Sequence, residues 1–148
     1  MTAVHRPATL EDAAALFDLR RRSILGLAVA GLPAGEAEAW AAKLTLAGME
    51  RKLREFEIWV AELNGVVAAW AAIRGDTLEG LYAAPEYAGR GVASGMLIRL
   101  EGLMIARGVA AVQAEASSNA KDFYLRRGYR MSGPQTVGGA WPITKDLR

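Results

Sequence analysis

The stretch LYAAPEYAGRGVAS, from Leu81 to Ser94, decides the fold expected for this chain of 148 residues. It begins as an apolar β-strand that Pro85 ends, and it leads through Gly89 and Gly91 into an amphipathic helix over 92–107. A glycine-containing turn from a strand into a helix directs backbone N–H groups and the positive helix end at one spot, which suits a phosphate or pyrophosphate. The alternative is a turn that uses glycine only for its conformational freedom. The glycine spacing matches neither a Walker A loop nor a Rossmann fingerprint.

The segments on either side of this stretch predict further strands. Ile58–Leu63 and Val66–Ile73 are apolar runs joined by Asn64-Gly65, and an Asn-Gly pair between two apolar runs is a strong hairpin signal. A turn at Gly75-Asp76 then leads into a third strand over Leu78–Ala83. Downstream, the pattern predicts a strand over Val109–Ala116, a short helix over Ala120–Arg127 and a final pair of strands from Gly128 to near Leu147.

The N-terminal third of the chain is predicted to be mainly helical. A short strand, Val4–Arg6, precedes Thr9, which has the pattern of a helix N-cap with Asp12 three residues later. We expect the helix that starts there to end around Gly26. The remaining expectations for this region are a loop at Gly31, Pro33 and Gly35, a helix over Glu36–Leu46 and a short charged helix over Glu50–Glu55.

Together these elements predict one mixed α/β (α+β) domain over residues 1–148. Helices flank a central sheet that is mostly antiparallel, with one parallel step from the strand near Leu81 to the strand near Val112. The length is that of a single domain, and no internal repeat or linker divides the chain.

The composition excludes several classes of site. The chain has no cysteine, which rules out disulfides, thiolate metal sites and a cysteine nucleophile. A single histidine, His5, makes a zinc site or a Ser-His-Asp triad hard to build, so we expect an ordinary strand residue there and no bound metal. A net charge of +2 does not favour nucleic acid. With no signal pattern and no long apolar run, we expect a soluble, cytoplasmic protein that does not bind membranes.

Two segments resemble motifs of the GNAT superfamily of N-acetyltransferases. Ala88–Ala93 is similar to the acetyl-CoA-binding motif, Gln/Arg-x-x-Gly-x-Gly/Ala, and Ala88 departs from it at the cost of one side-chain contact. Asn119 and the segment Phe123–Tyr129 are similar to a second motif. The resemblance implies a small acetyltransferase whose loop amides hold the CoA pyrophosphate and whose preceding strand pairs with the pantetheine arm. The cofactor-binding residues that it implies are Leu81, Tyr82, Ala83, Ala88, Gly89, Arg90, Gly91, Val92, Ala93, Ser94, Asn119 and Tyr124.

The same resemblance assigns catalytic and binding roles to two residues near the C-terminus. It implies that Tyr124 is the general acid that protonates the departing CoA thiolate and that Asn119 hydrogen-bonds the cofactor arm. A thiol with a pKa of about 8.5 leaves more easily if a positioned hydroxyl donates a proton. The alternatives are a packed aromatic ring for Tyr124 and a helix N-cap before Ala120 for Asn119.

The attacking amine has to lose a proton, and with no suitable histidine the base has to be a carboxylate or a water held by one. Glu79 and Glu115 are the candidates, because each lies in an otherwise apolar strand, where an unpaired carboxylate is costly. An edge or salt-bridged position is the alternative for each. Alternation along Thr77–Ala83 puts Glu79 on the face of Leu81 and Ala83, and we favour Glu79. If the two strands splay apart there, both carboxylates flank one water.

The acceptor is expected to be a primary amine of a small molecule or a peptide. Arg20–Arg22 either holds an acidic group of that acceptor or forms a solvated helix end. Trp40 is a candidate for the acceptor pocket, Trp59 and Trp70 are expected in the core, and Trp141 either covers the acceptor or packs a loop. Because relatives are frequently dimers, a homodimer is a further expectation. The competing function is a catalytically silent acyl-CoA-binding regulatory module of the same fold.

Overall fold

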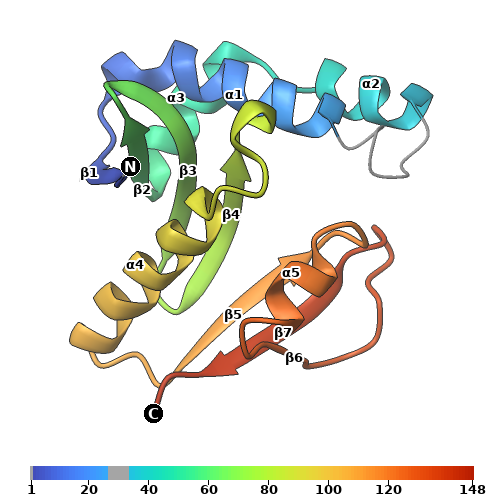
Figure 1. The fold of residues 1–148 in the computed structure, drawn as a ribbon. Helices are drawn as coiled ribbons and strands as arrows, with labels where there is room; N and C mark the ends of the chain where they lie inside the picture. The colour runs from blue at the N-terminus through green and yellow to red at the C-terminus, as the bar shows by residue number, and fades with distance from the viewer. Residues whose placement is uncertain (1, 27–33) are drawn as a thin grey trace.

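A computed structural model of the chain describes residues 2–26 and 34–148 (Figure 1). In these two ranges, seven strands form one sheet in the order β1-β2-β3-β4-β5-β7-β6. Paired strands are antiparallel except β4 and β5, which confirms the predicted mostly antiparallel sheet with one parallel step. The strands are β1 (Val4–Pro7), β2 (Glu57–Leu63), β3 (Val66–Arg74), β4 (Thr77–Ala83), β5 (Ala111–Ala116), β6 (Arg130–Met131) and β7 (Trp141–Asp146).

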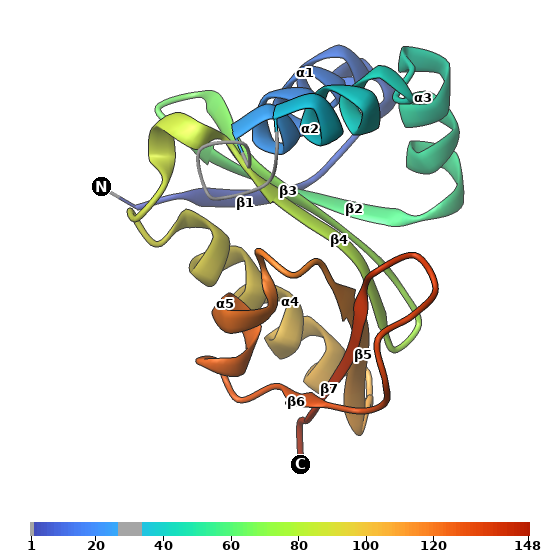
Figure 2. The same ribbon diagram turned by 90° about the vertical axis from the view of Figure 1, so that its right-hand side faces the viewer.

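Helices lie on both faces of this sheet (Figure 2). One group packs with Leu16, Leu19 and Met49 against β2 and β3, and the other packs on the opposite face with an apolar stripe of α4. The helices are α1 (Ala13–Gly26), α2 (Ala34–Ala42), α3 (Leu46–Glu55), α4 (Val92–Ala106) and α5 (Lys121–Leu125), and two short 3-10 turns are η1 (Leu10–Asp12) and η2 (Pro85–Tyr87).

The alternation of side chains along β3 supplies both cores. Trp70 is fully buried in the cluster under α1 and α3, and its indole N–H donates to the Leu16 carbonyl at 3.1 Å. Ala69 and Ala71 point to the other face, where Met96 and its neighbours on α4 cover them. Both faces of β3 are therefore dry, which explains why its sequence is a continuous apolar run rather than an alternating one.

The prediction for the second helix is wrong at its C-terminal end. α2 ends at Ala42, and Thr45 has an extended backbone with φ −132° and ψ 154°. The Thr45 hydroxyl accepts a hydrogen bond from the Gly48 amide at 3.0 Å, so Thr45 is the N-cap of a new helix. α3 consequently begins at Leu46 instead of Glu50. Of the loop expected at Gly31, Pro33 and Gly35, the first two residues lie outside the described residues, and the expectation is wrong for Gly35, which belongs to α2.

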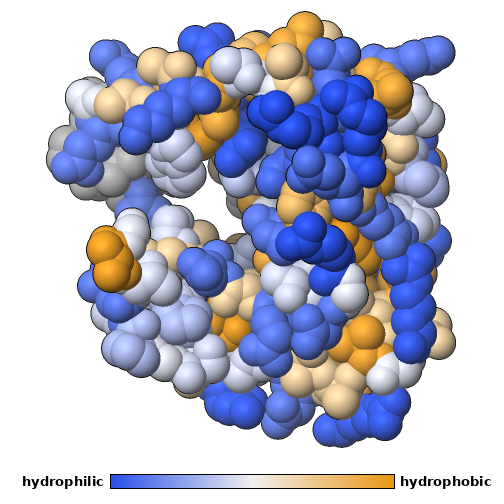
Figure 3. All heavy atoms as spheres, turned by 180° about the vertical axis from the view of Figure 1, so that it is seen from behind, coloured by the Kyte–Doolittle hydropathy of each residue, from blue (hydrophilic) through white to orange (hydrophobic). Residues whose placement is uncertain are grey.

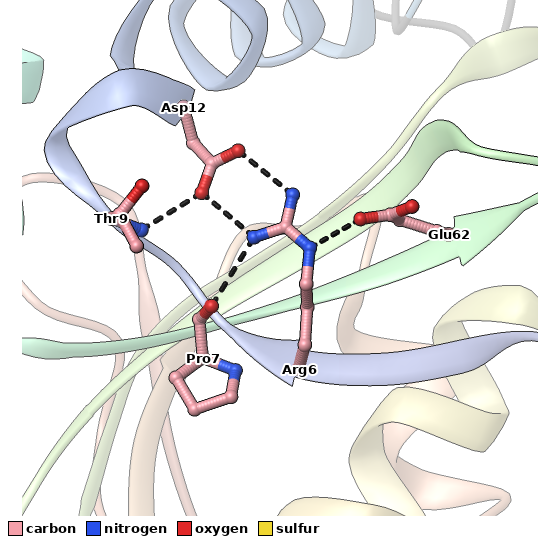
Figure 4. A network of polar contacts seen from close by, with 5 residues as sticks. All are labelled: Arg6, Pro7, Thr9, Asp12 and Glu62. Carbon is pink, nitrogen blue, oxygen red and sulfur yellow. Dashed lines mark hydrogen bonds and ion pairs between the residues drawn. The ribbon is translucent and has the colours of Figure 1, made fainter.

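Arg6 ties the first strand to the first helical turn and to the neighbouring strand (Figure 4). Its two terminal nitrogens donate to the Asp12 carboxylate at 2.8 Å each, and its Nε donates to Glu62 on β2. Asp12 also accepts a hydrogen bond from the Thr9 backbone N–H at 2.8 Å, which confirms the helix start predicted at Thr9. The network holds η1 against the edge of the sheet.

We expect the substitution Asp12→Asn to lower the free energy of unfolding at neutral pH by about 1–2 kcal/mol, because it weakens charge-assisted hydrogen bonds. Hydrogen bonding from Arg6 holds the pKa of Asp12 below its ordinary value. A carboxylate of this kind stabilises the fold above its unfolded pKa of about 3.9 and loses that contribution as pH falls through the folded value. Thermal unfolding followed from neutral pH into acid should therefore show a shallower acid decline for the variant.

The matched control is Asp18→Asn, because Asp18 is 60% exposed, against 12% for Asp12, and pairs with Arg22 one helical turn away. Its loss should leave both the melting temperature and the acid decline nearly unchanged. If the two variants behave alike, the Arg6 network does not stabilise the fold.

Candidate active site

The two strands that meet in parallel stay together for only two residue pairs. β4 and β5 pair at Thr77–Gln113 and at Leu78–Ala114, and no pairing continues beyond Leu78. Between the diverging strands lies a cavity of about 660 Å³, called here the β4–β5 cavity. Its walls are β4 from 78 to 82, the segment 115–120 that ends β5, Tyr124, part of α2 and the segment before β7. Seen from behind, the molecule is hollowed by a deep opening (Figure 3).

The structure brings six of the predicted site residues, including all three catalytic candidates, to this one cavity. Leu81 and Tyr82 line it from β4, and Asn119 and Tyr124 line it from the opposite side. Both predicted carboxylates, Glu79 and Glu115, are in its wall as well. Ala83 and the loop 88–94 do not line it.

Glu79 lies at a β-bulge, as the residue left unpaired between Leu78 and Gly80, which pair with consecutive residues of β3. The bulge reverses the alternation of β4, so that Leu78 and Leu81 pack in the same cluster under α4. The Glu79 carboxylate lies near Arg74 and acts on the charge of Lys52 in α3, whereas Leu81 and Ala83 pack in the cluster under α4, so the expectation that the three share a face is wrong. A bulge in an active-site strand commonly re-aims one side chain, and here that side chain is the carboxylate.

The two carboxylates have different surroundings. Glu79 has a side chain that is 28% exposed, and its Oε1 lies 3.9 Å from a terminal nitrogen of Arg74. Glu115 is exposed near the end of β5 and has no ion-pair partner within 4.0 Å in the described part of the chain. Both also border a second hollow on the outer side of the same strand gap. The splaying of the strands thus leaves the two carboxylates on either side of one space.

Tyr124 is the most buried of the predicted catalytic side chains. Its ring packs edge-on against Phe123 and Tyr129, at 5.2 and 5.3 Å between ring centroids, and it is only 7% exposed. Burial, and then the nearby Tyr82 hydroxyl, raises the pKa of Tyr124 above its ordinary value. The phenol is consequently protonated at any physiological pH and is available as a proton or hydrogen-bond donor to the cavity.

Asn119 does not cap the short helix α5. The N-cap is Ala120, whose amide is 3.3 Å from the Ser117 hydroxyl, and the Ser117 carbonyl accepts from both Ala120 and Lys121 at 3.0 Å. The alternative of Asn119 as a plain helix cap is therefore wrong. Asn119 instead lines the cavity, and its side chain is not used to cap the helix.

The loop 88–94 presents backbone amides to solvent. Gly89 and Gly91 have φ of +77° and +76°, and a Cβ added at either would meet no atom within 4 Å. Gly91 is the N-cap of α4, so the next amides begin the helix without intrahelical partners. Between Gly89 and Ser94, only the Arg90 amide donates to a described backbone carbonyl, that of Tyr87 at 3.2 Å. The predicted anion-binding geometry is present: open space, free donors and a positive helix end.

Tyr82 forms a wall between the β4–β5 cavity and the helices on the other side. Its ring packs against Trp70 in a tilted arrangement, with 4.8 Å between the ring centroids, and the Arg20 guanidinium lies over the Tyr82 ring, 5.1 Å from its centroid. Gly80 makes room for this ring, because an added Cβ would come within 2.8 Å of the Tyr82 Cε2 atom. Any side chain at position 80 would therefore displace the Tyr82 ring.

The three arginines of α1 have separate environments. Arg22 donates to Glu86 in η2 and to Asp18, at 2.8 Å in each case, and so braces the turn before the loop 88–94. Arg21 is exposed, and Arg20 lies against Tyr82. The sequence allowed two interpretations of Arg20–Arg22, a group that holds an acidic acceptor and a solvated helix end. Only Arg21 fits the second.

Part of the cavity wall was not predicted from the sequence. Trp40 lines the cavity as proposed. Gln135 and the segment Gly138–Ala140 also line it, although the sequence did not predict this, because the chain passes the cavity on its way into β7. Trp141 is not among the lining residues: its indole N–H lies 3.3 Å from the Ser118 hydroxyl, and Lys121 lies over its ring at 4.7 Å. Trp141 thus packs the turn beneath the site.

The remaining sequence expectations concern metals and membranes. His5 is in β1 as predicted, and burial followed by the charge of Arg99 lowers its pKa. Within residues 2–26 and 34–148, no three metal-ligating side chains come together. No helix in the same ranges has the length and apolar character needed to span a bilayer.

Comparisons with known proteins agree with this geometry. The sequence model of the acetyltransferase (GNAT) domain matches residues 28–144. A GCN5-related N-acetyltransferase structure from Rhodopseudomonas palustris is 31% identical, with a TM-score of 0.88 over 99% of this chain and 96% of that one. A comparison with curated proteins found no match.

Two further structures with the same fold were solved with a coenzyme bound. PaiA N-acetyltransferase from Thermoplasma acidophilum, in complex with coenzyme A, is 18% identical with a TM-score of 0.82 and 99% coverage of both chains. The yncA protein from Salmonella typhimurium, with its cofactor acetyl-CoA, is 22% identical with a TM-score of 0.67, covering 100% of this chain and 95% of that one. The diverging strands, the glycine loop at the start of α4 and the matched domain lead to one conclusion: the chain belongs to the GNAT acetyltransferase family.

Proposed function

We propose that this protein transfers an acetyl group from acetyl-CoA to a primary amine of a small molecule or peptide, by direct attack of the amine on the thioester. One observation carries the proposal. Tyr124, Asn119, Glu79 and Glu115 line a single cavity, and one wall of that cavity is the strand that leads into the loop 88–94. Membership of the family and the coenzyme-bound relatives support the choice of donor.

The residues present fit acetyl-CoA. The free amides at 89 and 91–94 would hold the pyrophosphate, with Arg90 adding positive charge beside them. On the edge of β4 away from β3, the residues beyond Leu78 have no strand partner. The backbone of Leu81–Ala83 is therefore open on that edge to pair with the pantetheine arm. Asn119 would hydrogen-bond the same arm from across the cavity.

Within this arrangement, acetyl-CoA supplies an activated acyl group, and the protein residues handle the protons. Glu79 accepts the amine proton through a water, because amines with a pKa of about 8 to 10 are mostly protonated at neutral pH. The amine nitrogen bonds to the acyl carbon, the carbon–sulfur bond breaks, and the Tyr124 hydroxyl donates its proton to the departing sulfur. Starting from the ammonium, the nitrogen loses one proton before the attack and a second as the amide forms; the thiol takes up one proton, and the other leaves to solvent through the water held by Glu79.

The test is a screen of small amines and peptides with acetyl-CoA, in which free thiol is measured and acetylated products are identified by mass spectrometry. We expect turnover that requires both acetyl-CoA and the amine. Tight binding of acetyl-CoA without turnover on any acceptor would overturn the proposal in favour of a silent acyl-CoA-binding module.

The assignment of the base is tested by the pair Glu79→Gln and Glu115→Gln. We expect Glu79→Gln to lower kcat by about 10²–10⁴-fold and to flatten the acidic limb of its pH profile, because a positioned base contributes about that much. Glu115→Gln should have a milder effect, since its carboxylate lies on the neighbouring strand and serves mainly to hold the shared water. kcat is followed across pH with one acceptor for both variants. The reverse order would move the role to Glu115, and two unaffected variants would mean that the amine arrives deprotonated.

A further inference from the structure

A second, smaller pocket lies on the other side of Tyr82 from the β4–β5 cavity. It has a volume of about 300 Å³ and is formed by α1, the α2–α3 connection and α3. We call it the basic pocket. It shares no lining residue with the β4–β5 cavity. Its charged lining residues are Arg20, Lys43, Arg51, Lys52 and Glu55.

The cations of the basic pocket have no anionic partner at ion-pair distance in the described part of the chain, although Arg20 and Lys52 lie over the rings of Tyr82 and Phe56 at 5.1 and 4.6 Å. None of its lysines and arginines has an ion-pair partner within 4.0 Å or a side-chain hydrogen bond in the described part of the chain. The Nε atom of Arg20 is buried without a hydrogen-bond partner among the same residues. A buried donor that is not used costs about 1–3 kcal/mol, which is a reason to expect a partner that is missing from the protein itself.

Two of these cations are also held close to one another. Burial, and then the charge of Arg20, lowers the pKa of Lys52. Glu79 and Glu55 act in the opposite direction but do not cancel the first two effects. Like charges brought together in a partly buried pocket are destabilising unless an anion lies between them.

We propose that the basic pocket binds a phosphate-type oxyanion. Four cationic side chains from α1, the α2–α3 connection and α3 converge on it, against one carboxylate, and a group with several oxygens can accept hydrogen bonds from more than one of them. The anion is either free phosphate or a phosphate group carried by the amine acceptor. The second source rests on the proposed acetyltransferase function, and the contact of Arg20, which lines the pocket, with Tyr82, which lines the cavity, places the two sites next to each other.

The first experiment uses inorganic phosphate and the full chain, without acetyl-CoA, so that its outcome does not depend on any acetyltransferase activity. Phosphate is titrated at constant ionic strength while amide shifts around Gly48 are followed by NMR, with chloride as the reference anion. We expect saturable shifts that are at least about tenfold weaker in Arg20→Gln and in Lys43→Gln, since each removes a charged hydrogen-bond donor. Lys43 is exposed, so its variant should fold even if Arg20→Gln is destabilised.

Matched controls come from the neighbouring residues. Arg21→Gln and Arg54→Gln remove the same charge from the same two helices, but neither residue lines the basic pocket. Both should bind phosphate like the parent. An absence of saturable shifts in the parent would overturn the proposal, and so would equal weakening by the lining and control variants, which would indicate only a diffuse charge effect.

The second experiment distinguishes the two sources once turnover is established. Phosphoethanolamine is compared with ethanolamine as acceptor, and KM is measured for the parent and for Arg20→Gln. If the phosphate belongs to the acceptor, the phosphorylated amine has the lower KM, free phosphate competes with it, and Arg20→Gln removes the advantage. If free phosphate is the ligand, it binds by NMR but changes neither KM. Either result supports an anion site, and the one that is observed identifies the source of the phosphate.

Discussion

In a Tyr124→Phe variant, kcat should be about 10²–10⁴-fold lower than in the parent, while acetyl-CoA binds as tightly as to the parent. The ring of Tyr124 packs between Phe123 and Tyr129, and phenylalanine keeps those edge-on contacts. Only the hydroxyl that faces the cavity is lost. Since burial raises the pKa of Tyr124, the parent should also show no loss of activity from ionisation of this phenol up to about pH 10.

The measurements are steady-state kinetics with one acceptor and calorimetry with acetyl-CoA. Tyr129→Phe is the matched control, because Tyr129 is an adjacent buried tyrosine that does not line the cavity and whose hydroxyl donates to Glu101 at 2.8 Å. That control should lower the melting temperature but leave kcat nearly unchanged. An unaltered kcat in Tyr124→Phe would reduce Tyr124 to a packing residue.

Gly89→Val and Gly91→Val should each weaken acetyl-CoA binding by well over tenfold. Both glycines have positive φ, and a side chain added there points into open space in front of the free amides of the loop 88–94. It would therefore block the close approach of a pyrophosphate to the backbone. Calorimetric titration with acetyl-CoA measures the effect without any need for an acceptor.

Backbone strain has to be separated from this steric effect, and the chain provides a matched control. Gly65 has φ of +78° in the β2–β3 turn, and a Cβ there would also meet nothing within 4 Å. Gly65→Val should carry a similar conformational cost, visible in the melting temperature, yet bind acetyl-CoA like the parent. Parental affinity in Gly89→Val and Gly91→Val would remove the loop 88–94 from the coenzyme site.

The features that the sequence predicted well are those that neighbouring residues determine. The hairpin at Asn64-Gly65 was predicted from that pair, and both residues have the positive φ, +53° and +78°, that a tight hairpin turn requires. The start of α4 after Gly91 and the buried stripe of that helix likewise depend on residues within a few turns of one another. The order of elements then predicted the mixed sheet and its parallel step.

The resemblance to GNAT motifs supplied the candidate residues but not their arrangement. Glu79 was expected to follow the alternation of β4, and a bulge opposite β3 re-aims it. The boundary between α2 and α3 was misplaced because the apolar and charged pattern around Thr45 is compatible with a continuous helix. In the structure, the side-chain hydrogen bond from the Gly48 amide to Thr45 starts a new helix there.

By itself, then, the sequence determined the fold class, the glycine loop at the start of α4 and the identity of the candidate catalytic residues. Only the tertiary structure decided that β4 and β5 separate after two pairs, that Trp40 and Gly138–Ala140 close one cavity with Tyr124, and that cations from α1 and α3 share a pocket behind Tyr82. The physical reason is the range of the interactions. Turns and helix caps are set by backbone preferences of adjacent residues, whereas a strand gap and a shared pocket depend on packing between segments that are far apart in the chain.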